Sequence, residues 1–324
     1  MQWMELSLHT THEAVDWVST MLGTTDYAGD IQVTEYLQDL GGSSPQPLDW
    51  AFTIFLHLPY DFRANTHVEE ITNRLFSLHR TGQASELQTV IVAEKPSQLS
   101  LSTLRHQIGK RFVILTTDAI YQPEDQPEIA DEISIRLKQS LSFGSGLHPT
   151  TIVSLQLLER HILPTMQGLD LGSGSGILSV AIAKLGASVL ALDNDSIAVQ
   201  STQDAVHRNG VAQQVTVMEG SLGGGSDLGH WMGGETLDHV PTLRPTGSFD
   251  FVVANLLARV HIILADDFRR ALRRTDLHPG LLMTAGFTTD YEDEVATALT
   301  NAGFEAVDCE RLNEWVALAY RLKA

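Results

Sequence analysis

The sequence predicts a two-domain α/β protein, in which a doubly wound, mostly parallel sheet follows a smaller α+β domain of ferredoxin-like topology. Three observations support this prediction. The chain has 324 residues, a length typical of two domains. Residues 1–94 alternate strand and helix periodicities in the order β-α-β-β-α-β. From residue 143 onward, apolar strands alternate with helices, as in parallel sheets covered on both faces.

The amino-terminal domain is predicted from periodicity, because its strands alternate apolar and polar residues and its helices carry one apolar face. Thr66 is predicted to cap the second helix, with Glu69 as its capping-box partner. The predicted elements are a strand at 3–10, a helix at 11–24, strands at 30–36 and 50–59, a helix at 66–80 and a strand at 87–95.

A connector is predicted over residues 95–110, which assigns residues 1–94 to the first domain and residues 111–324 to the second. Pro96 would end the last strand of the first domain. Within the connector, the sequence LSLSTLRHQIGK is predicted to form a short helix.

The second domain is predicted to contain a parallel sheet that ends in a hairpin, which places an antiparallel strand at or near the sheet edge. Asn209-Gly210 is predicted to end one of its helices. The predicted strands are 111–117, 132–138, 167–172, 188–193, 215–220, 249–256, 280–287, 305–312 and 314–322, and the predicted helices are 151–163, 177–186, 195–209, 259–274 and 291–303.

Composition excludes several classes of protein. With 43% apolar and 19% charged residues, the chain is neither disordered nor a coiled coil. Its formal charge of −19 disfavours direct nucleic-acid binding and favours a basic partner. Cys309 is the only cysteine and no Cys/His cluster has zinc spacing, so we expect no metal site and a cytoplasmic location. Neither a signal peptide nor a membrane span is expected.

The clearest motif is LDLGSGSG at residues 169–176, between a predicted strand and a predicted helix. Gly172 and Gly174 would let the backbone turn tightly and let a ligand approach the start of the helix. Asp193 ends the next strand, where a carboxylate can accept hydrogen bonds from a ribose diol. A dinucleotide fingerprint would need a glycine where Ile177 stands, so the spacing favours a different adenosine-containing cofactor over NAD.

Two further clusters accompany this motif. In SFGSGLHPTT, at residues 142–151, Pro149 suits a first helical turn and the Thr151 hydroxyl could cap the helix or reach a nearby site. His148 fits a helix-entry residue at least as well as a catalytic one. Asn255, at the carboxyl end of a strand, is predicted to face the ligand with its side-chain amide, the alternative being a turn former.

In this order, the motifs resemble the class I S-adenosylmethionine-dependent methyltransferases, and within them the PrmA family, which methylates large-subunit ribosomal protein eleven. The resemblance covers nearly all of residues 111–321. It implies a Rossmann-like sheet, S-adenosylmethionine as cofactor and a small amino-terminal domain that recognises a basic ribosomal protein. The segments that carry it are FGSGLHPTT, DLGSGSGILSVAIAKLGA, LDND, HRNGV, EGSL, FDFVVANLLA and EWVALAY.

The resemblance also implies residue roles. Gly172 and Gly174 would wrap the methionine part of the cofactor, Asp193 would hold its ribose, and Thr151 and Asn255 would line the same pocket. The reaction would be in-line attack of a neutral lysine or amino-terminal amine on the methyl group, with Asn255 orienting the amine as the catalytic residue. The same chemistry on another protein or a small amine remains an alternative. A cofactor-binding module without activity and an NAD-dependent oxidoreductase are more distant alternatives.

Three features fall outside these motifs. The glycine-rich insert at 220–248, about 29 residues long, is predicted to be a surface loop rather than a lid. The arginines at 269–274 follow Asp266 and Asp267, which predicts a solvated, salt-bridged helix face, with ribosomal RNA contact as the alternative. The first 62 residues hold nine acidic residues and no Lys or Arg, a field that could steer a basic protein substrate or simply favour solubility.

Overall fold

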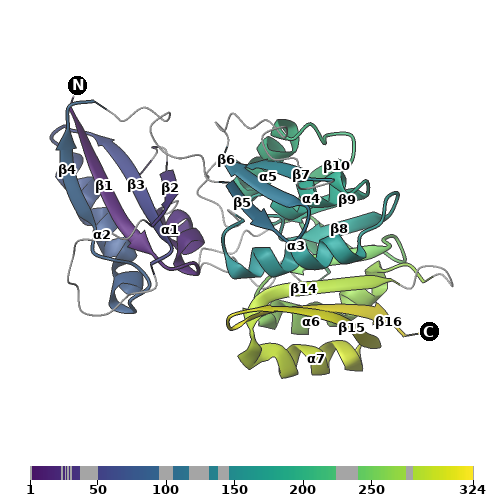
Figure 1. Ribbon diagram of the computed structural model, residues 1–324. Coiled ribbons are helices and arrows are strands. Elements are labelled where there is room, and N and C mark those ends of the chain that lie inside the picture. Colours follow the sequence, from purple (N-terminus) through teal and green to yellow (C-terminus); the bar gives the residue numbers. More distant parts are fainter. Residues whose placement is uncertain are drawn as a thin grey trace. The chain divides into compact units, whose positions relative to one another are not determined.

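The protein is described by a computed structural model in which the chain forms two compact units (Figure 1). One unit comprises residues 1–106, 114–122 and 137–148, and the other comprises residues 107–113, 123–136 and 149–324. The described residues are 2–22, 25, 27, 29, 31–36, 50–94, 105–116, 131–137, 146–223, 240–274 and 280–323.

The amino-terminal part of the chain has the predicted β-α-β-β-α-β order and the ferredoxin-like sheet order β2-β3-β1-β4. All three strand pairs are antiparallel. Alternate residues of β1 are buried, and they join residues of α1 and α2 in one apolar core. The elements are β1 (Trp3–Thr10), α1 (Ala14–Leu22), β2 (Ile31–Glu35), β3 (Phe52–Pro59), α2 (Ala64–Arg80) and β4 (Gln88–Val92).

The predicted start of α2 is wrong by two residues. The helix begins at Ala64 with Arg63 as its N-cap residue, and no side chain caps it there. Asp61 instead accepts a hydrogen bond from the Arg63 N–H at 2.8 Å, and so organises the turn before the helix. Thr66 therefore lies inside the first turn, where the predicted capping box with Glu69 does not form.

A three-stranded sheet of order β5-β6-β7 follows in the sequence. It is formed by β5 (Arg105–Ile108), β6 (Phe112–Thr116) and β7 (Ile133–Leu137). The end of the predicted connector helix is therefore a strand, because a turn at residues 109–111 lets β5 pair with β6 as a short hairpin. The rest of that predicted helix lies outside the described residues.

The larger unit is built on a seven-stranded sheet of order β10-β9-β8-β13-β14-β16-β15. Neighbouring strands from β10 to β14 are parallel, and β16 is antiparallel to both β14 and β15. The predicted closing hairpin is thus confirmed, with its antiparallel strand one position in from the edge. The strands are β8 (Gln167–Leu171), β9 (Ser188–Asp193), β10 (Val215–Glu219), β13 (Phe251–Asn255), β14 (Leu281–Thr288), β15 (Phe304–Leu312) and β16 (Trp315–Leu322).

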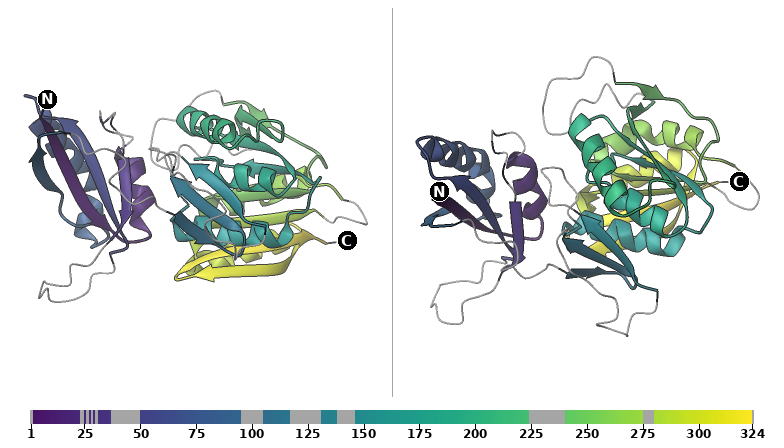
Figure 2. Two further views of the ribbon diagram at one scale, coloured as in Figure 1. Left: turned by 45° about the horizontal axis from the view of Figure 1, so that its top comes forward. Right: turned by 90° about the horizontal axis from the view of Figure 1, so that it is seen from above.

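Helices cover both faces of this sheet (Figure 2). On one face α3 packs against α4 and α4 against α5, and on the other α6 packs against α7. Right-handed crossovers require this division, because the strand order reverses between β8 and β13. The helices are α3 (Pro149–His161), α4 (Ile177–Lys184), α5 (Ser196–Arg208), α6 (Ala258–Ala271) and α7 (Glu292–Asn301), with a 3-10 turn, η4 (Thr289–Tyr291), before α7.

Two predicted helix ends of this unit are confirmed. Pro149 is the first residue of α3, where its missing N–H costs no helical hydrogen bond. Asn209 ends α5, and Gly210 follows it with a positive φ of 67°.

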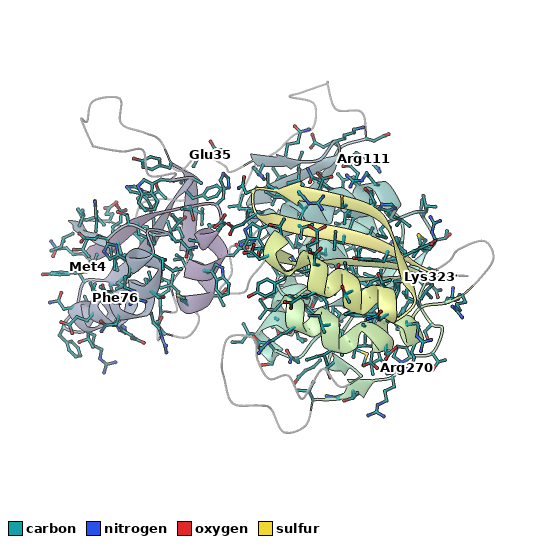
Figure 3. All side chains as sticks on the ribbon, turned by 90° about the horizontal axis from the view of Figure 1, so that it is seen from below. Met4, Glu35, Phe76, Arg111, Arg270 and Lys323 are labelled. Carbon is teal, nitrogen blue, oxygen red and sulfur yellow. The ribbon has the colours of Figure 1, made fainter. Side chains whose placement is uncertain are left out.

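The predicted arginine-rich helix face is confirmed in part. Arg269 pairs with Asp266 at 3.6 Å, and Arg270, which lies at the periphery of the unit in Figure 3, pairs with Asp267. Because α6 ends at Ala271, Arg273 lies beyond the helix and pairs instead with Asp250, at 2.7 Å.

The ends of the predicted insert are joined by a short parallel ladder. In it, β11 (Ser221–Leu222) pairs with β12 (Thr242–Leu243). The ladder begins beside β9, since Gly220 N–H donates to Asp193 O at 2.8 Å. Residues 224–239 of the insert lie outside the described residues. Within the described part of the chain, no helix is long and apolar enough to span a membrane.

Candidate functional site

The predicted site residues lie at the carboxyl ends of neighbouring parallel strands. Gly172 follows β8, Asp193 ends β9 and Asn255 ends β13. The order of strands reverses between β8 and β13, and in open α/β sheets ligands bind at such a switch point, outside the carboxyl ends. The topology therefore assigns these residues to the edge that binds a ligand.

The glycine-rich loop after β8 has a conformation that needs its glycines. Gly172, Gly174 and Gly176 have φ values of 75°, 54° and 81°, in the left-handed region that other residues rarely adopt. A Cβ on Gly176 would lie 2.9 Å from the Cα of Thr202, so this glycine also lets α4 and α5 approach each other. The predicted tight turn is thus present, and it leads directly into α4.

The glycine-rich loop and Asp193 are joined by a hydrogen bond. The Gly174 N–H donates to Asp193 Oδ2 at 2.9 Å, and the Asp195 N–H donates to Asp193 Oδ1 at 3.0 Å. Burial raises the pKa of the Asp193 carboxyl, which is 9% exposed, and these backbone donors oppose that shift. Each carboxylate oxygen keeps a second lone pair, so the side chain can still accept hydrogen bonds from two hydroxyls. Asp195 also caps α5 through the Ile197 N–H.

Asp170, on β8, is a further buried carboxyl, which the sequence motifs did not predict as a site residue. The Ser179 hydroxyl donates to its Oδ2 at 2.6 Å, whereas its Oδ1 is buried and makes no hydrogen bond within the described residues. Burial raises the pKa of Asp170 to about 7, and the charge of Asp193 adds to the shift. In the sequence, Asp170 is recognisable as a carboxylate near the end of an apolar strand, two residues before the first glycine of the motif.

Asn255 lies beside the start of α3, where its side-chain amide contacts Thr150. Asn255 Nδ2 lies 3.4 Å from the Thr150 hydroxyl oxygen. Asn255 Oδ1 and Thr151 Oγ1 are both buried and make no hydrogen bond within the described residues. Buried polar atoms in native proteins are nearly always hydrogen-bonded, so these two atoms mark a place where a polar ligand would bind.

Among the described residues, no group of three or more His, Cys, Asp or Glu could hold a metal ion. His148 is 1% exposed, and burial lowers its pKa to about 3. Its imidazole is therefore neutral at physiological pH, a state compatible with both a helix-entry residue and a catalytic one. Gly144 and Ser145, from the same predicted loop, lie outside the described residues.

Comparison with known proteins extends these findings to the whole chain. Residues 2–323 match the family model of the ribosomal protein L11 methyltransferases (PrmA). The ribosomal protein L11 methyltransferase of Chloroflexus aurantiacus is 39% identical, covering 98% of both chains, and that of Herpetosiphon aurantiacus is 34% identical, covering 99% of both. The crystal structure of a ribosomal protein L11 methylase from Lactobacillus delbrueckii subsp. bulgaricus is 26% identical, with a TM-score of 0.54, and covers 68% of this chain and 99% of that one.

The match decides among the families that the glycine-rich motif left open. It covers both units, whereas an NAD-dependent oxidoreductase would share only the general sheet topology. The full-length match, the two relatives and the arrangement of the carboxyl edge agree, and the chain belongs to the PrmA family of ribosomal protein L11 methyltransferases.

Proposed function

We propose that the protein transfers methyl groups from S-adenosylmethionine to amino groups of ribosomal protein L11, namely lysine side chains and the amino-terminal amine. The observation that carries the proposal is the carboxyl edge of the seven-stranded sheet, where the glycine-rich loop, Asp193 and Asn255 come from three neighbouring strands. The relatives named for this activity align with the chain from end to end, which supports the same substrate.

The residues at this edge fit S-adenosylmethionine. Asp193 suits a ribose diol, because both of its carboxylate oxygens are fixed by backbone N–H groups and retain free lone pairs. Gly172 and Gly174 have no side chains and adopt left-handed backbone conformations, so the methionine part could approach the loop closely. The unpaired Thr151 Oγ1 and Asn255 Oδ1 offer hydrogen-bonding atoms to the cofactor or to the amine.

Methyl transfer requires the protein to position the reactants more than it requires acid–base catalysis. When bound, S-adenosylmethionine supplies a methyl group on a sulfonium centre that is already a good leaving group. Asn255 Oδ1 is a buried acceptor, so it can take a hydrogen bond from the amine N–H and direct the nitrogen lone pair. Burial of the amine lowers its pKa and favours the neutral, nucleophilic form. Asn255 therefore acts as the catalytic residue without accepting a proton.

The amino-terminal domain, residues 1–94, is proposed to recognise the protein substrate, with residues 95–110 as connector and residues 111–324 as methyltransferase domain. Residues 1–94 hold thirteen acidic and three basic residues, a formal charge of −10. Such a field attracts a basic ribosomal protein and repels nucleic acid, so no direct nucleic-acid contact is proposed. The reaction is placed in the cytoplasm, where ribosomal proteins are made, and no membrane partner is proposed.

The direct test combines the purified protein, methyl-labelled S-adenosylmethionine and unmodified ribosomal protein L11. We expect label on lysine side chains and on the amino-terminal amine, located by mass spectrometry of peptides. The Asn255→Ala variant serves as the matched control, since it removes the proposed catalytic amide and keeps the fold. Absence of transfer by a protein that binds the cofactor would overturn the substrate assignment.

A second experiment separates this substrate from other acceptors. Labelled cofactor and the protein would be added to a lysate of cells that lack the gene, so that unmodified targets are present. One dominant labelled band at the ribosomal protein supports the proposal. Label on a different protein, or on a small amine, would keep the chemistry and change the acceptor.

A further inference from the structure

The segment that follows Asn255 is fastened to the neighbouring strand β14 through its backbone. The Leu256 N–H donates to the Ala285 carbonyl at 2.9 Å, one step beyond the register pair of Asn255 with Ala285. Asn255 is thus the last residue of β13, and its direction depends on where this segment leaves the sheet.

The side chain of His261, on α6, contacts the backbone carbonyl groups of both Leu256 and Ala285. Its Nε2 lies 2.9 Å from the Leu256 carbonyl oxygen and 2.9 Å from the Ala285 carbonyl oxygen. Both partners can only accept, so Nε2 carries the proton and donates to both. The ring is fully buried, and it packs edge-on against Phe287 with ring centroids 5.3 Å apart. Burial lowers the pKa of His261 to about 4, which keeps this neutral form at physiological pH.

Gly286 allows the close approach on which this arrangement depends. It has a φ of 94° and lies where the ladder between β14 and β16 is irregular, between Thr284 and Phe287. A Cβ at this position would lie 2.6 Å from the Leu256 nitrogen and closer still to the Leu256 carbonyl oxygen. Any side chain at position 286 would therefore push the segment after Asn255 away from β14.

Leu256 connects this arrangement to the glycine-rich loop. A Cβ on Gly172 would come too close to the Leu256 Cδ2 atom for an ordinary contact, so the Leu256 side chain packs against that glycine. A shift of the Leu256 backbone would move the support of the glycine-rich loop and the direction of Asn255 together.

We propose that His261 and Gly286 are positioning residues for methyl transfer, which hold Leu256 and Asn255 in register with the glycine-rich loop. Together with Leu256 and Ala285, these two residues form what we term the carbonyl clamp, defined by Leu256, His261, Ala285 and Gly286. The inference deepens the proposed function and rests on it, because it assigns the clamp to the same site. None of the clamp residues needs to touch the cofactor or the amine.

The sharpest test compares two glycine substitutions that share the strain of a positive φ. Gly286→Ala adds a Cβ against the Leu256 backbone, whereas Gly210→Ala, at a φ of 67°, adds one with no atom within 4 Å. We expect Gly286→Ala to lower kcat at least tenfold and to raise the Kd for S-adenosylmethionine at least threefold. Gly210→Ala should stay within twofold of the wild type in both. Equal values for the two folded variants would overturn the proposal.

Substitution of His261 provides an independent test. His261→Gln keeps an N–H donor of similar reach, and His261→Phe keeps the volume and removes the donor. We expect the glutamine variant to retain at least a third of the wild-type kcat and the phenylalanine variant to lose at least tenfold. Leu264→Val, buried on the same helix, controls for general loosening of α6. All assays would run well below the unfolding temperature of each variant, where a merely structural role leaves kcat unchanged.

Failure of the clamp and failure of the proposed function give different results. If ribosomal protein L11 is not the substrate, the wild type transfers no label to it, yet the Kd for S-adenosylmethionine still separates Gly286→Ala from Gly210→Ala. If the clamp has no positioning role, the wild type methylates the protein and the folded clamp variants do so equally well. The glycine and histidine pairs are independent, so either folded pair decides the question.

Discussion

The carboxyl edge of the seven-stranded sheet and the amino-terminal domain differ in how many residues their proposed roles depend on. At the edge, single backbone positions are decisive, as in the left-handed Gly172 and Gly174 and the Asp193 carboxylate fixed by two N–H groups. In the amino-terminal domain, by contrast, negative charge is spread over many residues. Residues 1–94 have a formal charge of −10, against −9 for residues 95–324. This domain also exposes apolar side chains, such as Phe76 at 58% and Val90 at 56%.

This difference has a physical reason. A cofactor contacts a few atoms at short range, so its site constrains backbone conformation and leaves a motif in the sequence. A protein substrate contacts a broad surface, where many replacements give similar charge and area. Substitutions at the edge should therefore have large, local effects, and those in the amino-terminal domain small, cumulative ones.

The largest effect is expected for Asp193→Ala. Two charge-assisted hydrogen bonds to a ribose diol contribute about 3 kcal/mol together, so the Kd for S-adenosylmethionine should rise about a hundredfold. Isothermal titration calorimetry measures this change. The matched control is Asp195→Ala, which removes the α5 cap at a cost of about 1 kcal/mol in stability and should leave the Kd within twofold. An unchanged Kd in a folded Asp193→Ala protein would refute the ribose assignment.

The next effect is expected for Asn255→Ala. Removing the acceptor for the amine should lower kcat about thirtyfold, equivalent to about 2 kcal/mol of transition-state stabilisation. The cofactor Kd should change less than kcat, which steady-state kinetics and calorimetry together establish. Thr150→Ser keeps the hydroxyl that Asn255 contacts and should behave nearly as the wild type. Equal turnover by Asn255→Ala and wild type would show that the amide has no catalytic role.

Much of the fold and of the site could be predicted from the sequence, because these parts depend on local patterns of residues. The four-stranded and seven-stranded sheets, the closing hairpin and the glycine-rich turn follow from periodicity and glycine spacing. The start of α2 was mispredicted because Asp61 organises the preceding turn, a competitor that the capping-box pattern at Thr66 does not reveal. The strand at residues 105–108 was mispredicted as helix, since four residues carry too little periodicity and pairing with β6 decides their state.

The parts of the site that sequence reasoning missed depend on tertiary contacts. His261 lies in an ordinary helical segment, and only the return of β14 beside β13 brings it the Ala285 carbonyl in addition to that of Leu256. The contact between Asn255 and Thr150 joins two residues that lie 105 positions apart in the sequence. Such contacts join residues far apart in the sequence, and no local pattern encodes them.

An intermediate effect, on stability, is expected from Asp170. Because its folded pKa is raised from 3.8 to about 7, its contribution to stability is complete below about pH 4 and is lost as pH rises through 7. Relative to Asp170→Asn, the wild type should lose about 2 kcal/mol of unfolding free energy between pH 5 and pH 6.5. Urea unfolding of both proteins at several pH values measures this difference. A difference that does not vary with pH would mean that Asp170 ionises alike in the folded and unfolded states.

The smallest effect is expected in the amino-terminal domain, where charge acts over distance. Raising the salt concentration from about 50 to 300 mM shortens the Debye length and should lower kcat/KM for the ribosomal protein a few-fold, while the cofactor Kd stays nearly constant. The double variant Glu69→Gln and Glu94→Gln, which neutralises two exposed carboxylates, should lower kcat/KM about twofold. Asp290→Asn with Glu305→Gln removes the same charge from exposed positions of the methyltransferase domain and should change less. If the two double variants behave alike, or if salt has no effect, the acidity of the first domain contributes to solubility and does not steer the substrate.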